Sequence, residues 1–270
     1  MVAASPPPNA DRIDGYLLAN RAAETADRFA ALSDTFDEWT RRRLCALGIG
    51  EGWSCWEVGA GGPRVPGWLT ELVGASGRVL ATDIDVSWMP SGSPFEVRCH
   101  DVVTDPVPEG GFDLVHARLV LTHIPRRIEA LRRMSSALRP GGWLVVEDFD
   151  VSCQPRACPD AATDDEERAN RIRAGFIELL ADRGADLVLG RTLRKRLVAL
   201  GLTDVGAEAY APLAVPATRV LERANIEQVR EGLVALGLGD DVDRHLEALA
   251  AGRIEIATPP LVTAWGRRPT

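Results

Sequence analysis

The stretch Glu57-Val58-Gly59-Ala60-Gly61-Gly62-Pro63 joins a short apolar segment at 53–58 to a helical pattern at 65–73. Glycine residues let the backbone turn sharply and let a ligand lie against bare main chain. A helix that begins just after the turn directs unpaired N–H groups and the positive end of its dipole toward a carboxylate or a phosphate. The order of strand, glycine turn and helix therefore indicates a ligand-binding turn, and a turn of purely structural use is the alternative.

Strand and helix patterns alternate around this turn from residue 51 to residue 150. Short apolar runs predict strands at 53–58, 77–81, 95–98, 112–117 and 143–146. A helical pattern at 126–138 is ended by Pro140-Gly141-Gly142, and the run that follows is apolar throughout, as in buried parallel strands. Such alternation predicts right-handed βαβ units around a parallel sheet, a fold of the α/β class.

Helical patterns flank this core on both sides. Thr163 and Glu166 have the spacing of a capping box, which opens a helical segment at 163–200, and a second segment follows at 218–251. We expect both segments to pack above the sheet as a cap. The expected single domain has four parts: a helical cap segment at 11–50, a ligand-binding core at 51–150, cap helices with strand six at 151–252, and a terminal strand at 253–270.

The composition is that of an ordinary globular chain, with 46% apolar and 26% charged residues among 270. With 31 basic and 39 acidic residues, the net charge is −8. We expect no nucleic-acid partner, because nucleic-acid binding needs a basic surface. No apolar run is long enough to span a membrane, and the first residues lack the pattern of a secretory signal, so we expect a cytoplasmic protein without a membrane partner.

The cysteine pattern does not predict a structural crosslink or a metal site. Five cysteines form an odd set without a CxxC pair. A disulfide framework is therefore not expected, and no spacing typical of zinc ligands is present. We expect a site without a metal.

Two acidic residues follow successive predicted strands. Asp83 ends the second strand, where a carboxylate can accept two hydrogen bonds from a ribose diol. Asp101 lies just past the third strand, where its carboxylate can accept a hydrogen bond from an adenine amino group. Each acid alone would be read as a solvated loop residue, but their joint placement favours a nucleoside site. The dinucleotide fingerprint is incomplete, because Arg64 stands where its third glycine belongs, and this disfavours NAD.

From about Trp53 to Asp150 the chain resembles the class I S-adenosylmethionine-dependent methyltransferases. The resemblance rests on EVGAGG at 57–62, ATDID at 81–85, CHDV at 99–102, FDLVHARLVLTHIP at 112–125 and LRPGGWLVVEDF at 138–149. The stretches YLLAN at 16–20 and LVTAWGRRP at 261–269 further resemble the actinobacterial small-molecule methyltransferases of that family. The resemblance implies a Rossmann-like seven-stranded sheet of order 3-2-1-4-5-7-6 with an antiparallel last strand.

The resemblance also implies S-adenosylmethionine as the cofactor and a role for individual residues. The methionine part is expected at Glu57 and at the backbone of Gly59, Ala60 and Gly61. The ribose is expected at Asp83 beside Ile84, and the adenine at Trp88, Asp101 and Val102. The carbonyl near Ala117 is expected to accept a hydrogen bond from the amino group of the cofactor.

Three further residues near the turn carry expectations of their own. Arg118 follows the fourth strand and is expected to bind the carboxylate of the cofactor or to pair with Glu57. Tyr16 is expected to close over the cofactor from the N-terminal helix. Pro63 replaces the third glycine of the family's turn, and it lacks an N–H group and fixes φ. It is tolerated if residue 63 is the first helical position.

The histidines offer one candidate catalytic group. His123 follows the fourth strand at the rim of the sheet, where a neutral imidazole could accept a proton from the substrate. The alternative is that His123 orients the helix that begins near Pro125. His116 is expected to be a packed core residue, and His245 is expected to be solvated.

The expected function is transfer of a methyl group from S-adenosylmethionine to O, N or C of a small molecule in specialised metabolism. An apolar acceptor site is expected at Phe176, Leu179, Leu180 and Tyr210. The chain would act as a monomer or a homodimer. One alternative is an RNA methyltransferase, which the net charge disfavours. The other is a relative that binds S-adenosylmethionine without methylating, a cyclase or a binding module, which only Pro63 favours.

Overall fold

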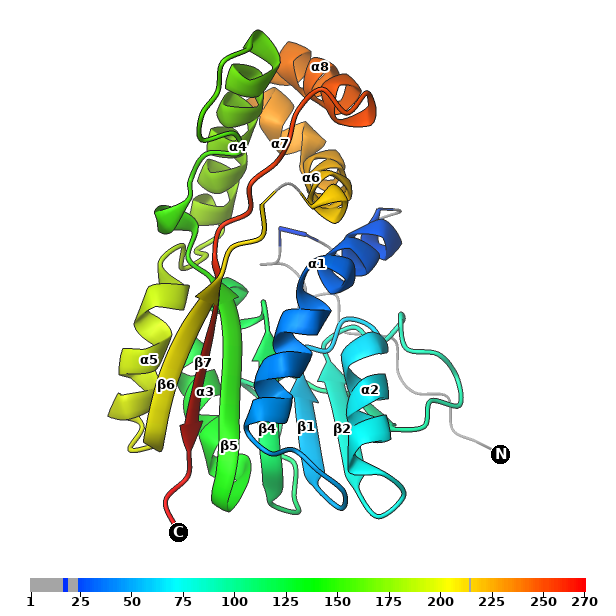
Figure 1. The fold of residues 1–270 in the computed structure, drawn as a ribbon, viewed down its shortest axis with the longest axis vertical. Helices are drawn as coiled ribbons and strands as arrows, with labels where there is room; N and C mark the ends of the chain where they lie inside the picture. The colour runs from blue at the N-terminus through cyan, green and yellow to red at the C-terminus, as the bar shows by residue number, and fades with distance from the viewer. Residues whose placement is uncertain (1–16, 19–23, 214) are drawn as a thin grey trace.

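The computed structural model describes residues 17–18, 24–213 and 215–270. Seven strands form one sheet in the order β3-β2-β1-β4-β5-β7-β6 (Figure 1). The strands are β1 (Ser54–Val58), β2 (Arg78–Asp83), β3 (Glu96–Cys99), β4 (Phe112–Arg118), β5 (Leu138–Phe149), β6 (Thr203–Tyr210) and β7 (Leu261–Arg267). Strands β1 to β5 are parallel, and β7 runs antiparallel to both of its neighbours. The α/β prediction and the implied strand order are therefore confirmed.

The central strands are buried on both faces, which explains their continuous apolar runs. All residues of β4 except Arg118 are buried, as are the last four of β1. Helices cover both faces of a parallel sheet, so both sets of alternating side chains leave water. The edge strand β3 is mostly exposed and carries charged side chains, which hinder edge-to-edge pairing with other chains.

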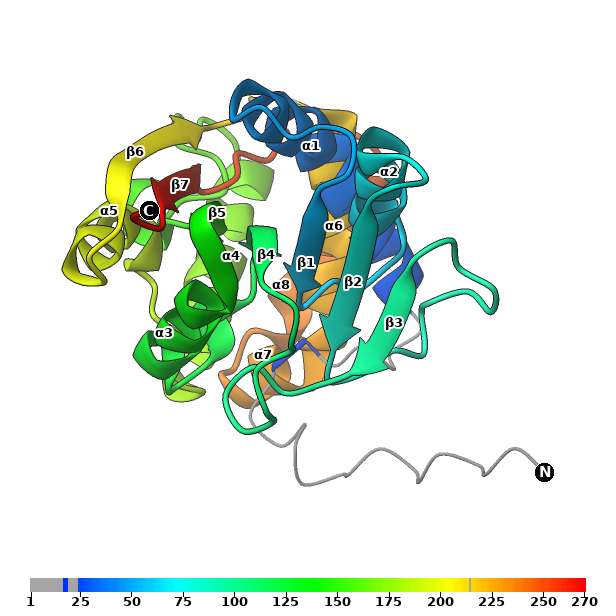
Figure 2. The ribbon, with the colours of Figure 1, turned by 90° about the horizontal axis from the view of Figure 1, so that it is seen from below.

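Helices lie on both faces of the sheet and above it (Figure 1). They are α1 (Thr25–Ala46), α2 (Arg64–Val73), α3 (Arg127–Ala137), α4 (Asp164–Asp182), α5 (Leu189–Ala199), α6 (Pro216–Gln228), α7 (Arg230–Ala235) and α8 (Gly239–Ala250). Figure 2 shows α1 and α2 on one side of the sheet and α3 on the other. Among the described helices, none has both the length and the apolar composition that a bilayer crossing needs.

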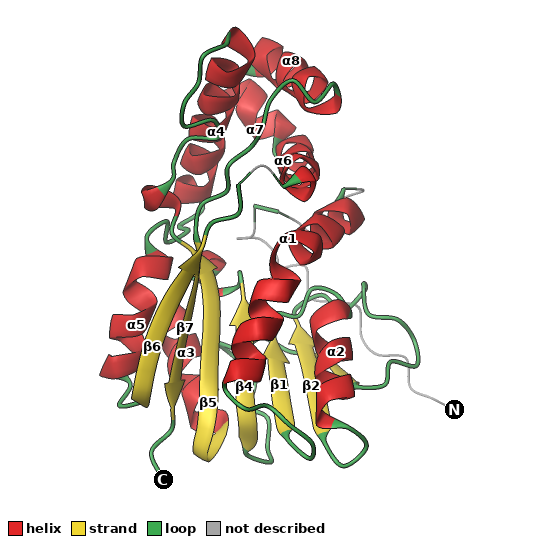
Figure 3. Ribbon diagram, in the orientation of Figure 1, coloured by secondary structure: helices red, strands yellow, loops and turns green. Residues whose placement is uncertain are grey.

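Four helices form a cap above the carboxyl ends of the parallel strands (Figure 3). In it, Phe176 and Leu180 of α4 pack with Ile226 of α6, Leu233 of α7 and Val242 of α8. Helix α1 reaches from the sheet to the cap, where it packs along α6. The predicted capping box opens α4, because Thr163 Oγ1 accepts from the Glu166 N–H group and the Glu166 carboxylate accepts from the Thr163 N–H group.

Helix α5 does not belong to the cap, and that expectation is wrong. Its apolar side chains Leu189, Leu193 and Leu197 pack into the sheet core together with Leu131 of α3. The helix therefore covers one face of β5, β6 and β7. A leucine stripe specifies that one face is buried, but it does not specify which surface buries it.

Three other local expectations differ from the structure. The helical segment expected at 218–251 is interrupted at Val229, which separates α6 from α7. Strand β5 begins at Leu138, before the proline and glycines that were expected to separate it from α3, and its pairing with β4 is irregular there. His245 was expected to be solvated but is fully buried, because it lies on the same face of α8 as Val242.

Candidate cofactor and acceptor site

A cavity of about 760 Å³ lies between the carboxyl edge of the sheet and the cap. Its volume falls within the range of small-molecule sites. The sheet side contributes residues that include Glu57, Asp83 and Asp101, and the cap side contributes Phe176, Leu180, Leu221 and Asn225. One space thus connects the predicted nucleoside site with an apolar chamber under the cap.

In the glycine turn, two glycines each have a neighbouring side chain close to the position where a Cβ atom would lie. Gly59 and Gly61 both have φ of +63°, where a side chain is strained. A Cβ on Gly59 would lie 2.4 Å from Val120 Cγ2, and a Cβ on Gly61 would lie 3.1 Å from the ring of Phe29. The sequence therefore needs glycine at both positions, and Ala60 between them also lines the cavity.

Pro63 does not disturb the turn. Pro63 directly precedes α2 and has φ of −83°. The helix begins at Arg64, one residue after the start at residue 63 that the sequence analysis considered. The Pro63 carbonyl accepts a hydrogen bond from the Gly67 N–H group at 2.9 Å. The N–H group of a residue that directly precedes a helix makes no hydrogen bond within the helix. Proline at this position therefore removes no helical hydrogen bond.

Asp83 connects the end of β2 with the glycine turn. Its Oδ2 accepts from the Gly61 N–H group at 2.9 Å, and its Oδ1 accepts from the Asp85 N–H group at 3.0 Å. Burial raises the pKa of Asp83, and these two N–H groups counter that shift. The carboxylate is thereby held in place at the cavity, with acceptor capacity left for a diol.

The other predicted nucleoside residues lie around the same space. Asp101 lines the cavity, and its carboxylate also accepts from the Val103 N–H group and the Thr104 hydroxyl at 2.7 and 2.8 Å. Trp88 packs edge-on against Phe29 with ring centroids 6.0 Å apart. The cavity lining also includes Ile84 and Val102.

One predicted cofactor residue, Ala117, is not part of the described cavity lining. Ala117 is fully buried within β4 between β1 and β5, and the cavity lining includes Arg118, the residue that follows it. Tyr16 lies outside the described residues.

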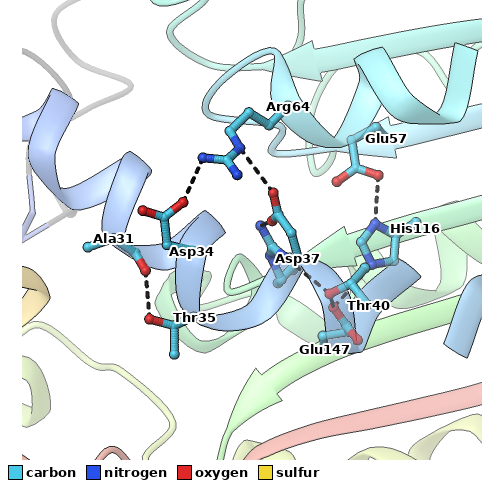
Figure 4. A network of polar contacts seen from close by, with 10 residues as sticks. Ala31, Asp34, Thr35, Asp37, Thr40, Glu57, Arg64, His116 and Glu147 are labelled. Atoms are coloured by element: carbon cyan, nitrogen blue, oxygen red, sulfur yellow. Dashed lines mark hydrogen bonds and ion pairs between the residues drawn. The ribbon is translucent and has the colours of Figure 1, made fainter. Parts of the chain in front are cut away.

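Glu57 forms part of a fully buried charged cluster (Figure 4). Its Oε2 is 2.6 Å from His116 Nδ1, and His116 Nε2 is 3.5 Å from Glu147 Oε2. Burial alone would lower the pKa of His116, but Glu57 and Glu147 raise it to about 9. The expectation of a packed core histidine is confirmed, although its surroundings are ionic rather than apolar.

Arg118 pairs with helix α1 and not with Glu57. Its Nη2 donates to Asp37 Oδ1 at 2.8 Å, and its Nη1 donates to Thr40 Oγ1 at 3.0 Å. Asp37 also pairs with Arg64 at the start of α2, 3.2 Å away. The sequence could not show this, because Asp37 lies 81 residues before Arg118. Arg118 nevertheless lines the cavity.

His123 lies in a short 3-10 helix, η2 (Leu121–His123), at the cavity wall. Burial, together with the charges of Arg28 and Arg127, lowers the pKa of His123 to about 4. The imidazole is therefore neutral near pH 7 and able to accept a proton, although it is a weaker base than an exposed histidine.

Two polar groups of the cavity, Asp148 and Asn225, were not predicted from the sequence. Asp148 lies at the end of β5 and accepts from the Thr122 N–H and hydroxyl groups at 3.1 and 2.6 Å. Burial raises the pKa of this carboxyl to about 6. Asn225 of α6 also lines the cavity, and its Oδ1 is buried without a hydrogen-bond partner. Asp148 could have been predicted, because it follows the predicted strand at 143–146 by two residues, just as Asp83 follows the predicted strand at 77–81.

The apolar acceptor site is only partly the one expected. Phe176 and Leu180 line the cavity. Leu179 instead packs toward Gly232, and Tyr210 stacks on Trp39 with ring centroids 5.0 Å apart. These two side chains pack within the cap and against α1, and neither is part of the described cavity lining.

The polar groups of the cavity fit the cofactor that the resemblance implies. Glu57 has a carboxylate that would suit an ammonium group, and Asp83 has one that would suit a ribose diol. His100 lines the cavity with a buried Nδ1 that has no hydrogen-bond partner, next to Asp101. The donor and acceptor set matches an amino-acid nucleoside, and Arg64 and Arg118 could meet its carboxylate.

Comparisons with known proteins agree with this fold. A family model described as a methyltransferase domain matches residues 18–206. Methyltransferase str3 of Strobilurus tenacellus is 27% identical over 187 residues, which cover 66% of this chain and 63% of that relative. The ubiquinone/menaquinone biosynthesis C-methyltransferase UbiE of Hahella chejuensis is 28% identical over 127 residues, covering 43% of this chain and 51% of that relative. The chain thus spans less than two thirds of the length of these curated relatives.

A solved structure shares the fold at low sequence identity. It is phosphoethanolamine N-methyltransferase 2 of Haemonchus contortus in complex with S-adenosyl-L-methionine, with a TM-score of 0.57 and 15% identity. The match covers 96% of this chain and 60% of that one. Because the family model spans well over half of the residues, the chain belongs to the methyltransferase domain family.

Proposed function

We propose that this chain transfers a methyl group from S-adenosylmethionine to a small, largely apolar acceptor held under the cap. The observation that carries the proposal is the single cavity of about 760 Å³, which joins the acids at the sheet edge to the apolar side chains of the cap. When bound, S-adenosylmethionine supplies a methyl group that its sulfonium already activates. The residues of the chain then need to orient two partners, exclude water and, for some acceptors, remove a proton.

On the cofactor side, three acidic residues near the ends of three strands would each bind a different part of S-adenosylmethionine. Glu57 would hold the ammonium group, Asp83 the ribose, and Asp101 with the Val102 backbone the adenine. The Gly59–Gly61 backbone would lie against the methionine part, and Trp88 and Ile84 would contact the nucleoside. Arg118 would meet the carboxylate, while Tyr16 and the carbonyl near Ala117 complete the proposed set.

On the acceptor side, the cap supplies a chamber of low polarity. Its wall includes Phe176, Leu180 and Leu221, and its polar groups include Asn225 and His123. Orientation of two partners in such a space can lower a barrier by roughly 7 kcal/mol or more. For a hydroxyl or carbon acceptor, His123 is the proposed proton acceptor, which would add roughly 10²–10⁴-fold.

The acceptor is proposed to be an intermediate of specialised metabolism, as in the actinobacterial enzymes that the sequence resembles. A small-molecule acceptor is supported by the relative UbiE, whose name places it in ubiquinone and menaquinone biosynthesis. An RNA acceptor is the less favoured candidate, because the net charge is −8 and the cap wall of the cavity is apolar. A relative that binds S-adenosylmethionine without methylating is the other candidate, but Pro63, which favoured it, leaves the turn and helix intact.

The test is release of S-adenosylhomocysteine with a panel of phenols, amines and carboxylic acids as acceptors. Turnover of at least one small acceptor, lost in Asp83→Ala and kept in a variant of the exposed Asp182, is the expected result. Tight RNA binding that weakens steeply with salt would favour the RNA candidate. Cofactor binding without turnover of any acceptor would favour the non-methylating candidate.

A further inference from the structure

His116 is the fully buried centre of a group of three side chains from three neighbouring strands. Glu57 of β1 lies beside it in register, and Glu147 of β5 approaches from the other side. Glu57 is 2% exposed, and Glu147 and His116 are 0% exposed. Of these three, Glu57 is the one that lines the cavity, so the other two act on a ligand only through it.

The three groups need a positive charge at their centre. Two carboxylates buried side by side would repel each other and would each lose hydration, which is strongly unfavourable without a cation. A neutral imidazole has a single N–H group and could serve only one of them. An imidazolium offers an N–H group to each side, so the geometry is that of a cation between two anions.

The far side of the group is attached to helix α1. Glu147 Oε2 accepts from Thr40 Oγ1 at 2.5 Å, and Glu147 Oε1 accepts from Thr263 Oγ1 of β7 at 2.6 Å. Two further charged groups join this side: Arg118 of β4 also donates to Thr40, and Asp37 of α1 pairs with Arg118. Helix α1 in turn supplies a wall of the cavity that includes Phe29.

We propose that His116 is a positioning residue for the cofactor. As an imidazolium it holds Glu57 Oε2, which leaves Oε1 of the same carboxylate to receive the ammonium group, and it ties this carboxylate through Glu147 and Thr40 to the helix that covers the site. The proposal rests on the proposed role of Glu57 in cofactor binding. It concerns the amino-acid end of the cofactor and leaves the nucleoside end untouched.

This difference between the two ends of the ligand gives the test. S-adenosylhomocysteine carries the amino-acid part, and methylthioadenosine has the same adenine and ribose without it. In His116→Gln, the amide can reach one carboxylate but carries no charge. Calorimetry should show S-adenosylhomocysteine binding weakened by about tenfold or more, with methylthioadenosine binding unchanged within about twofold.

The matched control is His245→Gln in the cap. His245 is also fully buried and lies beside a buried carboxylate, with Nε2 3.7 Å from Glu222 Oε1, but it does not belong to the described cavity wall. Its replacement should leave the binding of both ligands unchanged. Equal weakening of both ligands in His116→Gln would show a merely structural role and overturn the proposal, as would unchanged binding of both.

A measurement on the unaltered chain keeps the proposal testable if His116→Gln does not fold. Nitrogen NMR of the four histidines, assigned with glutamine variants of His100, His123 and His245, should show His116 protonated on both ring nitrogens at about pH 8. A neutral His116 at that pH contradicts the proposal.

Glu57→Gln separates failure of the inference from failure of the function. If this variant binds S-adenosylhomocysteine as well as the unaltered chain does, the proposed role of Glu57 is wrong and the inference falls with it. If Glu57→Gln weakens binding but His116→Gln does not, only the inference is wrong.

Discussion

Asp83 Oδ2 accepts a hydrogen bond from the Gly61 N–H group at 2.9 Å, so the end of β2 holds the glycine turn that follows β1. The two parts are 22 residues apart in sequence. One carboxylate therefore both shapes the turn and lines the cavity. A change at either residue should act on ligand binding more than on the rest of the fold, because the sheet itself does not depend on this bond.

Alanine substitutions at Gly59 and at Gly67 should differ strongly in their effects on ligand affinity and on stability. Gly59→Ala should reduce S-adenosylhomocysteine affinity by about tenfold or more and lower the free energy of unfolding by about 1–3 kcal/mol, since the new Cβ would collide with Val120 at a positive φ. Gly67→Ala is the control, because nothing lies within 4 Å of its Cβ position in α2. It should leave binding unchanged and alter stability by less than about 1 kcal/mol. Calorimetry and urea unfolding measure both effects, and equal results for the two variants would refute this view of the turn.

Replacement of His123 should change the catalytic rate and leave cofactor affinity nearly unchanged. If it accepts the proton, His123→Ala should lower kcat by at least about 10²-fold with nearly unchanged S-adenosylhomocysteine binding. Because the pKa of His123 is lowered to about 4, the rate should stay level through about pH 6.5 and fall only as the pH approaches about 4. A loss of less than about tenfold would leave orientation as the main catalytic effect and remove His123 from the catalytic residues.

His116 should make stability depend on pH in the alkaline range. Its pKa is raised to about 9 in the folded chain, against about 6.5 when unfolded, so the folded state binds the extra proton between these values. This contribution is complete below about pH 6.5 and is lost as the pH rises through about 9, and it amounts to about 3 kcal/mol. Urea unfolding of the unaltered chain and of His116→Gln measures it. Parallel stability curves for the two proteins across this range would contradict the raised pKa.

The cap contains a buried ion pair whose loss should be costly. Arg173 Nη2 is 2.7 Å from Glu222 Oε2, with side chains 6% and 4% exposed. Burial opposes the charge of Glu222, but Arg173 and His245 lower its pKa to about 2. Arg173→Met should therefore lower the free energy of unfolding by about 3–5 kcal/mol, because it leaves a buried carboxylate without its partner.

The control for this pair is Arg223→Met, which breaks an exposed pair with Asp27. Those side chains are 50% and 58% exposed, and such pairs contribute about 1 kcal/mol or less. Similar losses in the two variants, measured by urea unfolding, would mean that burial of the cap pair has no energetic consequence.

Much of the sheet could be predicted from the sequence because its signals are local. The apolar runs of β1 and β4, the glycine turn and the acids Asp83 and Asp101 each lie within a few residues of the strand end that defines them. Parallel strands bring their carboxyl ends to one edge, so residues far apart in sequence were expected to meet at the cavity. The resemblance to a known family added the strand order.

The contacts that could not be predicted depend on packing between distant segments. The partner of Arg118 is Asp37 on α1, and the surroundings of His116 depend on the register of β1 and β5. His245 was expected to be solvated because it is polar. Its spacing, three residues after Val242 and four before Leu249, instead places it on the buried face of α8. Asp148 was not predicted, although it lies two residues after the predicted strand at 143–146, as Asp83 does after the predicted strand at 77–81.

Calorimetric titration of S-adenosylhomocysteine into the unaltered chain and into Asp83→Ala tests most directly whether the cavity is an S-adenosylmethionine site. We predict a single site in the unaltered chain and binding weaker by about 1.5–3 kcal/mol in the variant, the range for a hydrogen bond to a charged group. No binding to the unaltered chain, or equal binding by the two proteins, would contradict it.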